Sequence, residues 1–176
     1  SNPKLSKTSY NRKSCNIGVV HLGFGAFHRA HQAVYIDDYM ELTGDINWGI
    51  AAVNLRRNDS VAFVEASSVE DGYVVKVIGF DDSTMFRLSR SHIKFVDAVS
   101  QPEDAYDLFS LHTVKMVTLT VTESGYYFGS NWRLDTTAEP ISSGLSGSAS
   151  ETIYAFLAKA LDRRAKTINE PLTLLS

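Results

Sequence analysis

The sequence has few of the features that mark disulfide-rich, membrane or nucleic-acid-binding proteins. Its 176 residues contain one cysteine, Cys15, so no disulfide can form within the chain and a reducing compartment is compatible. No apolar run approaches the length that spans a bilayer, and the polar, basic N-terminus lacks the hydrophobic core of a secretion signal. Lys and Arg form no cluster longer than a pair and the net charge is -3, which argues against a nucleic-acid surface. We therefore expect a cytoplasmic protein without a membrane or nucleic-acid partner.

One short stretch combines an apolar strand, a glycine turn and a helix-compatible segment. Ile17–Leu22 reads as a buried strand, Gly23 and Gly25 follow it, and no further Pro or Gly occurs before Gly44. In parallel α/β sheets this order brings a helix N-terminus to the carboxyl edge of the sheet, where free backbone N–H groups favour a pyrophosphate. The first glycine allows a backbone conformation closed to other residues, and the second allows a phosphate to come close.

The glycine pattern is incomplete, because His28 stands at the third position of G-x-G-x-x-G. That glycine normally permits close packing of the helix on the strand. Its replacement predicts either a modified turn or a helix set further from the sheet. Two glycines alone do not decide the function, since many turns between a strand and a helix contain them.

The residues around the glycines are more specific. Residues 23–33 read Gly-Phe-Gly-Ala-Phe-His-Arg-Ala-His-Gln-Ala, which closely resembles the G-x-G-x-F-H-R-A-H-Q-A signature of the mannitol dehydrogenase family. Residues 48–56, 118–126 and 151–157 resemble further segments of that family in the same order and spacing. The family includes mannitol and arabinitol 2-dehydrogenases and the fructuronate and tagaturonate reductases. The resemblance covers nearly the whole chain.

The fold expected is α/β: a Rossmann-like, mostly parallel sheet flanked by helices, with a small antiparallel β insertion. The spacing of apolar residues, and the positions of residues that interrupt helices and strands, predict a polar arm at residues 1–15 and a long loop at 124–148. The predicted strands are 17–22, 48–55, 114–121 and 171–175; the predicted helices are 27–42, 58–67, 102–111 and 149–164; the insertion comprises 72–80, 84–88 and 92–95. Residues 1–176 would form the N-terminal dinucleotide-binding domain, and by resemblance a largely helical catalytic domain lies C-terminal to it.

The turn and the first helical residues are the predicted pyrophosphate site. These residues are Gly23, Phe24, Gly25, Ala26, Phe27, His28 and Arg29. Arg29 could face a phosphate or the substrate cleft, and its alternative role is a structural ion pair with Asp37 or Asp38. His28 and His31 are three residues apart, but no further ligand stands at metal-binding spacing, and the family is regarded as metal-independent. We therefore expect no metal.

An acidic residue after the second strand is expected to set cofactor preference. Asp59 could accept hydrogen bonds from the adenosine ribose and repel a 2′-phosphate, although it comes later than usual. The family places an acidic pair here, and Asn58 departs from that pair. With Arg56 and Arg57 nearby, NAD is preferred and NADP is an alternative. The other role open to Asp59 is that of a helix cap.

Three residues at the end of the predicted central strand, residues 114–121, complete the predicted site. By resemblance, Thr120, Thr122 and Glu123 pass the nicotinamide half of the cofactor. The alternative is that the threonines simply belong to a strand face. Because carboxyl ends of parallel strands line the cofactor crevice, their position agrees with the first role.

The resemblance implies reversible hydride transfer between NAD(H) and a sugar alcohol and ketose, or reduction of a hexuronate. The family's catalytic base is a lysine in the second domain, and no lysine here matches that motif. No catalytic residue is therefore assigned in this chain, which alone would bind the dinucleotide without appreciable turnover. Two alternatives remain open: a non-enzymatic dinucleotide-binding or sensing module, and an α/β scaffold in which the turn is only structural.

Overall fold

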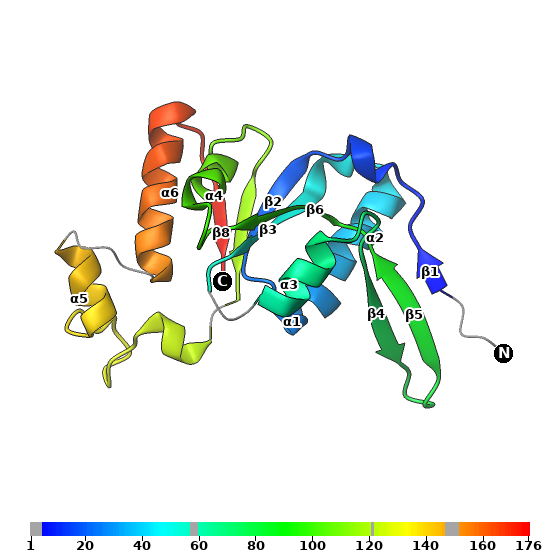
Figure 1. The fold of residues 1–176 in the computed structure, drawn as a ribbon, viewed down its shortest axis with the longest axis horizontal. Coiled ribbons are helices and arrows are strands. Elements are labelled where there is room, and N and C mark those ends of the chain that lie inside the picture. Colours follow the sequence, from blue (N-terminus) through cyan, green and yellow to red (C-terminus); the bar gives the residue numbers. More distant parts are fainter. Residues whose placement is uncertain (1–4, 57–59, 121, 147–151) are drawn as a thin grey trace.

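The structure is a computed structural model that describes residues 5–56, 60–120, 122–146 and 152–176. Its centre is a five-stranded sheet in the order β6-β3-β2-β7-β8, in which every neighbouring pair is parallel (Figure 1). The strands are β2 (Ile17–Leu22), β3 (Gly49–Asn54), β6 (His92–Asp97), β7 (Met116–Leu119) and β8 (Thr173–Leu175). The prediction of a mostly parallel α/β sheet is confirmed, with β2 at its centre.

Helices cover both faces of this sheet. α4 (Pro102–Phe109) and α6 (Ile153–Thr167) pack on one face, and α2 (Gln32–Thr43) packs on the other. The remaining helices are α1 (Ala26–Ala30), α3 (Ser60–Ser67) and α5 (Glu139–Leu145). Along β2 the side chains alternate: Val20 and Leu22 join the large core under α4 and α6, whereas Val19 packs in the smaller core with Ala33 of α2. β2 and β3 are buried along almost their whole length, as parallel strands covered on both faces are.

The predicted helix 27–42 is two helices, α1 and α2, separated at His31, whose φ of -123° and ψ of -83° are not helical. Both His28 of α1 and Ala33 of α2 are fully buried. In one continuous helix, residues five apart would point roughly 140° apart. The break lets both side chains face the sheet, which explains the difference from the prediction.

The insertion is smaller than predicted and includes the N-terminal arm. β4 (Tyr73–Ile78) and β5 (Thr84–Ser89) form an antiparallel hairpin, and β1 (Leu5–Lys7) from the predicted polar arm pairs parallel to β5. Figure 1 shows this hairpin projecting from the domain on the side away from α4 and α6. Residues 92–95 were wrongly placed in the insertion. They belong to β6, which pairs with β3 in the main sheet because His92 and Val96 are buried there.

The predicted loop 124–148 contains short ordered elements. A 3-10 helix, η3 (Glu123–Tyr126), follows β7, an isolated bridge joins Phe128 to Leu134, and α5 comes next. Two further 3-10 helices, η1 (Arg12–Ser14) and η2 (Ile46–Trp48), precede β2 and β3. Within the described ranges, no helix is both long and apolar enough to cross a membrane.

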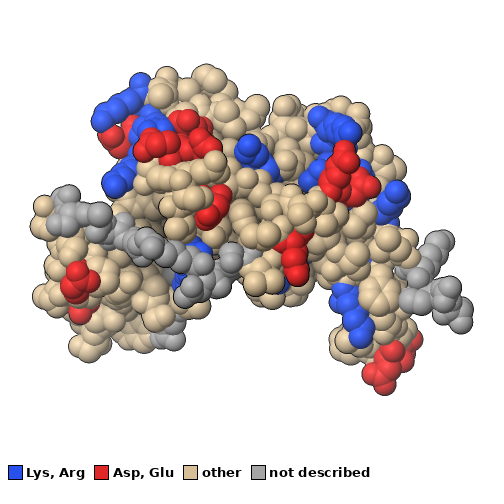
Figure 2. Space-filling view, viewed as in Figure 1, with Lys and Arg blue, Asp and Glu red and all other residues tan. Residues whose placement is uncertain are grey.

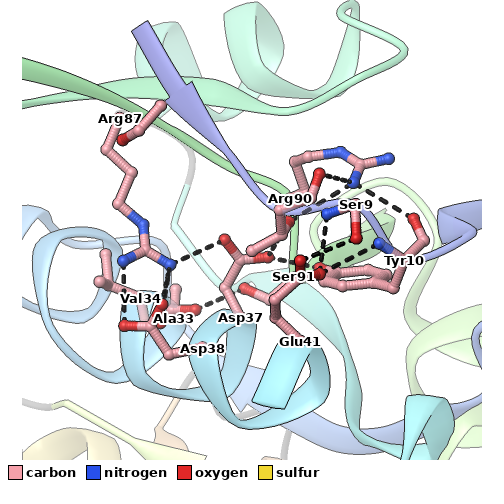
Figure 3. A network of polar contacts seen from close by, with 12 residues as sticks. Ser9, Tyr10, Ala33, Val34, Asp37, Asp38, Glu41, Arg87, Arg90 and Ser91 are labelled. Carbon is pink, nitrogen blue, oxygen red and sulfur yellow. Dashed lines mark hydrogen bonds and ion pairs between the residues drawn. The ribbon is translucent and has the colours of Figure 1, made fainter. Parts of the chain in front are cut away.

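A buried carboxylate ties the arm and the hairpin to α2 (Figure 3). Asp37 is fully buried and accepts hydrogen bonds from the hydroxyls of Tyr10 and Thr8. Arg87 of β5 reaches across to Asp37 at 3.1 Å and binds both carboxylate oxygens of Asp38 at 2.6 and 2.9 Å. A buried charge is stable only when paired and hydrogen-bonded, so these contacts fix where the hairpin leaves the domain.

Charges elsewhere are mixed in sign. Figure 2 shows basic and acidic side chains next to one another on the viewed face, over α4 and α6 and along the hairpin. Arg163 of α6, for example, binds Glu103 and Asp107 of α4. Both acidic partners are largely exposed, so this group contributes little to stability.

Replacing Arg87 with alanine should therefore destabilise the chain far more than replacing Arg163. R87A leaves the buried Asp37 carboxylate without its cationic partner, so the free energy of unfolding should fall by about 3 kcal/mol. R163A removes a partly exposed arginine whose two acidic partners are largely exposed, so the free energy of unfolding should fall much less. Urea denaturation of both variants measures the difference. Equal losses would contradict the role assigned to the Asp37 network.

Candidate functional site

The glycine turn lies at the carboxyl end of β2 and is anchored to the neighbouring strand. The Gly23 N–H donates to the Val53 carbonyl at 2.8 Å, and Gly23 has a φ of +115°, which favours glycine. Gly25 is different, because its φ of -68° and ψ of 158° suit any residue. A Cβ built there would meet nothing closer than the Thr120 hydroxyl at 3.9 Å. The missing side chain at Gly25 therefore leaves open space that the fold itself does not need.

This space belongs to a pocket of about 470 Å³ at the carboxyl edge of the sheet. Its walls come from the turn, the ends of β3 and β7, α3, η3 and the start of α6. The lining residues are Leu22, Gly23, Phe24, Gly25, Ala26, Arg29, Asn54, Leu55, Arg56, Ala62, Thr120, Thr122, Gly125, Tyr127, Thr152 and Ile153. Segments far apart in the sequence thus meet at the crevice where open α/β sheets bind ligands.

The pocket brings together seven of the predicted site residues: Gly23, Phe24, Gly25, Ala26, Arg29, Thr120 and Thr122. Two others point elsewhere. Phe27 is 68% exposed and packs against His31, and His28 is fully buried behind the turn. Glu123 begins η3 but its side chain is outside the described part of the chain, as are Asn58 and Asp59 altogether.

Arg29 is the cation of the turn. Its guanidinium lies 5.3 Å from the centre of the Phe24 ring, and its carbonyl accepts a hydrogen bond from the Tyr73 hydroxyl at 2.9 Å. The alternative ion pair with Asp37 or Asp38 is not formed, because both carboxylates bind Arg87. Arg29 thus places a positive charge at the pocket.

Phe24 is held by a cage of aromatic rings. Four rings meet it edge to face, with centroid distances of 5.1 to 5.9 Å: His92, Phe95, Tyr73 and Phe63. Such edge-to-face contacts are favourable and restrict the ring. Because Arg29 lies over Phe24, the cage also limits where the guanidinium can go.

The end of β3 supplies polar groups that sequence reasoning missed. The Asn54 side-chain amide donates to the Arg56 carbonyl and to Asp97, both at 3.0 Å, and its oxygen accepts from the Arg56 N–H. Hydrogen bonds from Ser100, and then from Asn54, lower the pKa of Asp97 below its usual value. The position of Asn54 at a strand's carboxyl end was the available signal.

Three buried histidines lie directly behind the turn. His28 stacks on His21 of β2 with ring centroids 3.3 Å apart and planes 5° from parallel, and its Nε2 lies 2.9 Å from Nε2 of His92 on β6. His28 Nδ1 is 2.8 Å from the Gln32 oxygen, and His21 Nδ1 is 2.7 Å from the Thr118 hydroxyl. The sequence offered one hint, a histidine within the buried run of β2, which needs a polar partner.

The hydrogen bonds of this histidine cluster (His21, His28 and His92) are consistent with three neutral rings. Because the Gln32 oxygen only accepts, His28 donates through Nδ1, and its Nε2 accepts from His92. Burial lowers the pKa of His28 to about 4 and that of His21 to about 2, and holds that of His92 well below its usual value. Desolvation penalises the charged form of each ring.

A second hollow of about 770 Å³ runs between α4 and α6. It shares Leu55 and Thr152 with the pocket at the turn, so the two adjoin at the edge of the sheet. Its apolar lining includes Ala98, Val99 and Phe156. In the described ranges, no three His, Cys, Asp or Glu residues are placed to hold a metal ion.

Comparison with known proteins gives a consistent result. A family model described as "Mannitol dehydrogenase Rossmann domain" matches residues 17–176. The chain is 34% identical to D-arabinitol 4-dehydrogenase of Klebsiella pneumoniae over 158 residues, covering 89% of this chain and 34% of the relative. It is 31% identical to mannitol 2-dehydrogenase of Cereibacter sphaeroides over 174 residues, covering 98% and 36%. The chain spans about a third of the length of these relatives.

Two solved structures are similar. One is Pseudomonas fluorescens mannitol 2-dehydrogenase in a ternary complex with NAD and D-mannitol, with a TM-score of 0.89 and 28% identity over 98% of this chain and 35% of that one. The other is a D-sorbitol dehydrogenase in substrate-free form, with a TM-score of 0.84 and 22% identity over 97% and 36%, a likeness in fold.

The histidine cluster predicts how stability depends on pH. An unfolded histidine titrates near pH 6.5. The folded pKa values lie lower, so below that pH the unfolded chain binds protons that the folded chain excludes. The free energy of unfolding should therefore be highest above about pH 6.5. It should fall as the pH is lowered toward about 5, by up to about 1.4 kcal/mol per pH unit for each histidine.

Urea denaturation at several pH values measures this slope. The variant His28→Phe removes one titrating ring and should flatten the slope by about 1.4 kcal/mol per pH unit. Carboxylates contribute mainly below about pH 5, so the interval above it isolates the histidines. A free energy of unfolding that stays constant across that interval would contradict neutral burial of the cluster.

Proposed function

This chain belongs to the mannitol dehydrogenase family, and we propose on that basis that it is the dinucleotide-binding domain of an NAD-dependent polyol or hexuronate oxidoreductase. One observation carries the binding role. Gly25 has a backbone conformation open to any residue, yet its missing side chain leaves free space in a pocket at the carboxyl edge of the sheet. A dinucleotide pyrophosphate needs such close approach to the backbone.

The turn would hold the pyrophosphate. Gly23, Gly25 and Ala26 provide the backbone, and Arg29, which lines the same pocket, provides the charge. α1 has five residues and ends at Ala30, so its dipole is short and cannot be the main attraction. The arginine therefore matters more here than in a turn that opens a long helix. Phe24 would orient it, whereas Phe27 and His28 act from outside the pocket.

The adenosine end would lie toward the α4–α6 hollow. That hollow adjoins the turn pocket through Leu55 and Thr152, and its apolar lining suits a purine ring. Asn58 and Asp59 follow the end of β3 in the sequence and remain our proposed ribose partners. Asp59 disfavours a 2′-phosphate, so NAD is the proposed cofactor; Arg56, which lines the pocket, keeps NADP as the alternative.

The nicotinamide end would pass Thr120, Thr122 and Glu123, because the two threonines line the pocket beyond the end of β7. The bound cofactor would accept or supply a hydride at the substrate carbon. The residues of this chain bind and orient that cofactor. The base that moves the hydroxyl proton, and most contacts to a sugar alcohol, ketose or hexuronate, would come from a C-terminal domain. The single, unpaired Cys15 is compatible with a cytoplasmic enzyme.

The variant Gly25→Ala tests the binding role directly. The added methyl group fits the backbone and the surrounding atoms, so stability should change by less than about 1 kcal/mol. The same methyl group would occupy the space a phosphate needs, so NADH affinity should fall at least about tenfold. Fluorescence titration and urea denaturation measure the two effects.

Gly129→Ala is a matched control, because Gly129 lies outside the pocket and has no tight contact at its Cβ position. It should leave both stability and NADH affinity unchanged. If Gly25→Ala bound NADH as the parent chain does, the turn would not be the pyrophosphate site.

Parallel titration with NADH and NADPH tests cofactor choice and the alternatives. Quenching of, or energy transfer from, Trp48 and Trp132 reports binding, and NADH should bind more tightly than NADPH. Tighter NADPH binding would assign the dominant role to Arg56 or Arg57. Binding with negligible reduction of fructose or fructuronate is expected of the chain alone, and appreciable turnover would overturn that expectation.

A further inference from the structure

His28 stands where the common dinucleotide turn has its third glycine. Its side chain is fully buried, although it belongs to the first turn of α1 and lies three residues after Gly25. The imidazole fills the space between α1 and β2, where it stacks on the His21 ring at 3.3 Å. A glycine would let the helix approach the strand, whereas here an aromatic ring separates them.

The ring is fixed from three directions. Gln32 of α2 holds Nδ1 at 2.8 Å, His92 of β6 holds Nε2 at 2.9 Å, and the face lies on His21 of β2. Gln32 is fixed in turn by the Thr118 hydroxyl of β7 at 3.0 Å. The position of α1 relative to β2 and β6, and through Gln32 to β7, is thus set through one side chain.

Arg29 follows His28 directly, and its contacts depend on where α1 lies. Its carbonyl is held by the Tyr73 hydroxyl, and its guanidinium lies over Phe24 at the pocket. His92 connects the two arrangements, because it binds His28 and also packs edge to face on Phe24. A shift of α1 toward β2 would therefore carry Arg29 away from Phe24 and from the pocket.

We propose that His28 is a positioning residue for the dinucleotide site: its ring spaces α1 from β2 and so places Arg29, and the backbone after Gly25, for a pyrophosphate. The inference rests on the proposed dinucleotide binding. It accounts for two features together, a histidine in place of a glycine and a turn whose positive charge comes from a side chain. The short α1 offers little dipole of its own, so the placement of the guanidinium decides the affinity.

The groups around the His28 ring favour its neutral form. The charged groups that face the cluster are Arg29 and Arg12, whose guanidinium donates to the His92 carbonyl, and both are cations. Tyr73 faces it as a neutral phenol, with its ring 5.6 Å from that of His92. A protonated His28 would be penalised by burial and repelled by the Arg29 guanidinium.

Two variants of the 176-residue chain separate spacing from hydrogen bonding. His28→Gly removes the ring and restores the glycine, and should weaken binding of NADH and of ADP about tenfold while changing AMP binding less than about threefold. His28→Phe keeps the ring and the stack, and should keep NADH affinity within about threefold of the parent chain even where stability falls. Calorimetric titration with NADH, ADP and AMP gives the affinities, and circular dichroism verifies that each variant is folded.

The comparison of ligands distinguishes positioning from a general structural role. A general structural defect would lower the affinity for all three ligands alike. Misplacement of the turn would lower the affinity only for NADH and ADP, which contain a pyrophosphate. The inference would be overturned if His28→Gly bound NADH as tightly as the parent chain, or if its affinities for NADH and AMP fell equally. Either result would leave the proposed function intact. A parent chain that binds neither NADH nor ADP would refute the proposed function itself. His21→Ala thins the same stack from β2 and carries the same expectation if the glycine variant does not fold.

Discussion

The stacking of His28 on His21 is the contact on which the arrangement of the glycine turn depends. It joins the first helix after the glycine turn to the central strand, and its hydrogen-bond partners extend to α2 and β6. Burying three imidazoles costs desolvation, which the hydrogen bonds of the cluster offset only while the rings are neutral. The rest of the turn, including the caged Phe24 and the arginine over it, lies against this cluster.

A second polar group performs a comparable task on the other side of α2. Asp37, buried and bound by Tyr10, Thr8 and Arg87, holds the N-terminal arm and the hairpin in place. Tyr73 of that hairpin then reaches back to the Arg29 carbonyl. The hairpin therefore helps to hold the turn in place, since its two strands contact α2 through Arg87 and α1 through Tyr73.

Much of the fold could be predicted because buried parallel strands and glycine turns leave strong local signals. The apolar runs at Ile17–Leu22 and before Thr120 identified β2 and β7, and the glycines located the pocket. Local patterns could not predict which strands and side chains that are far apart in the sequence lie next to each other. His92 looked like part of an insertion because alternation alone does not name a strand's neighbour. His28 suggested a modified turn, but only the contacts with His21 and His92 identify what fills the gap.

The sequence separation within the histidine cluster has a consequence for folding. His21 pairs with Thr118 across 97 residues, and His28 with His92 across 64. Closing loops of that length costs entropy before any contact is gained, so such contacts form late relative to a local hairpin such as β4–β5. The cluster cannot be complete until β2, β6 and β7 are assembled. The proposed nucleotide site is therefore complete only at the end of folding, after the strands that carry these side chains have been assembled.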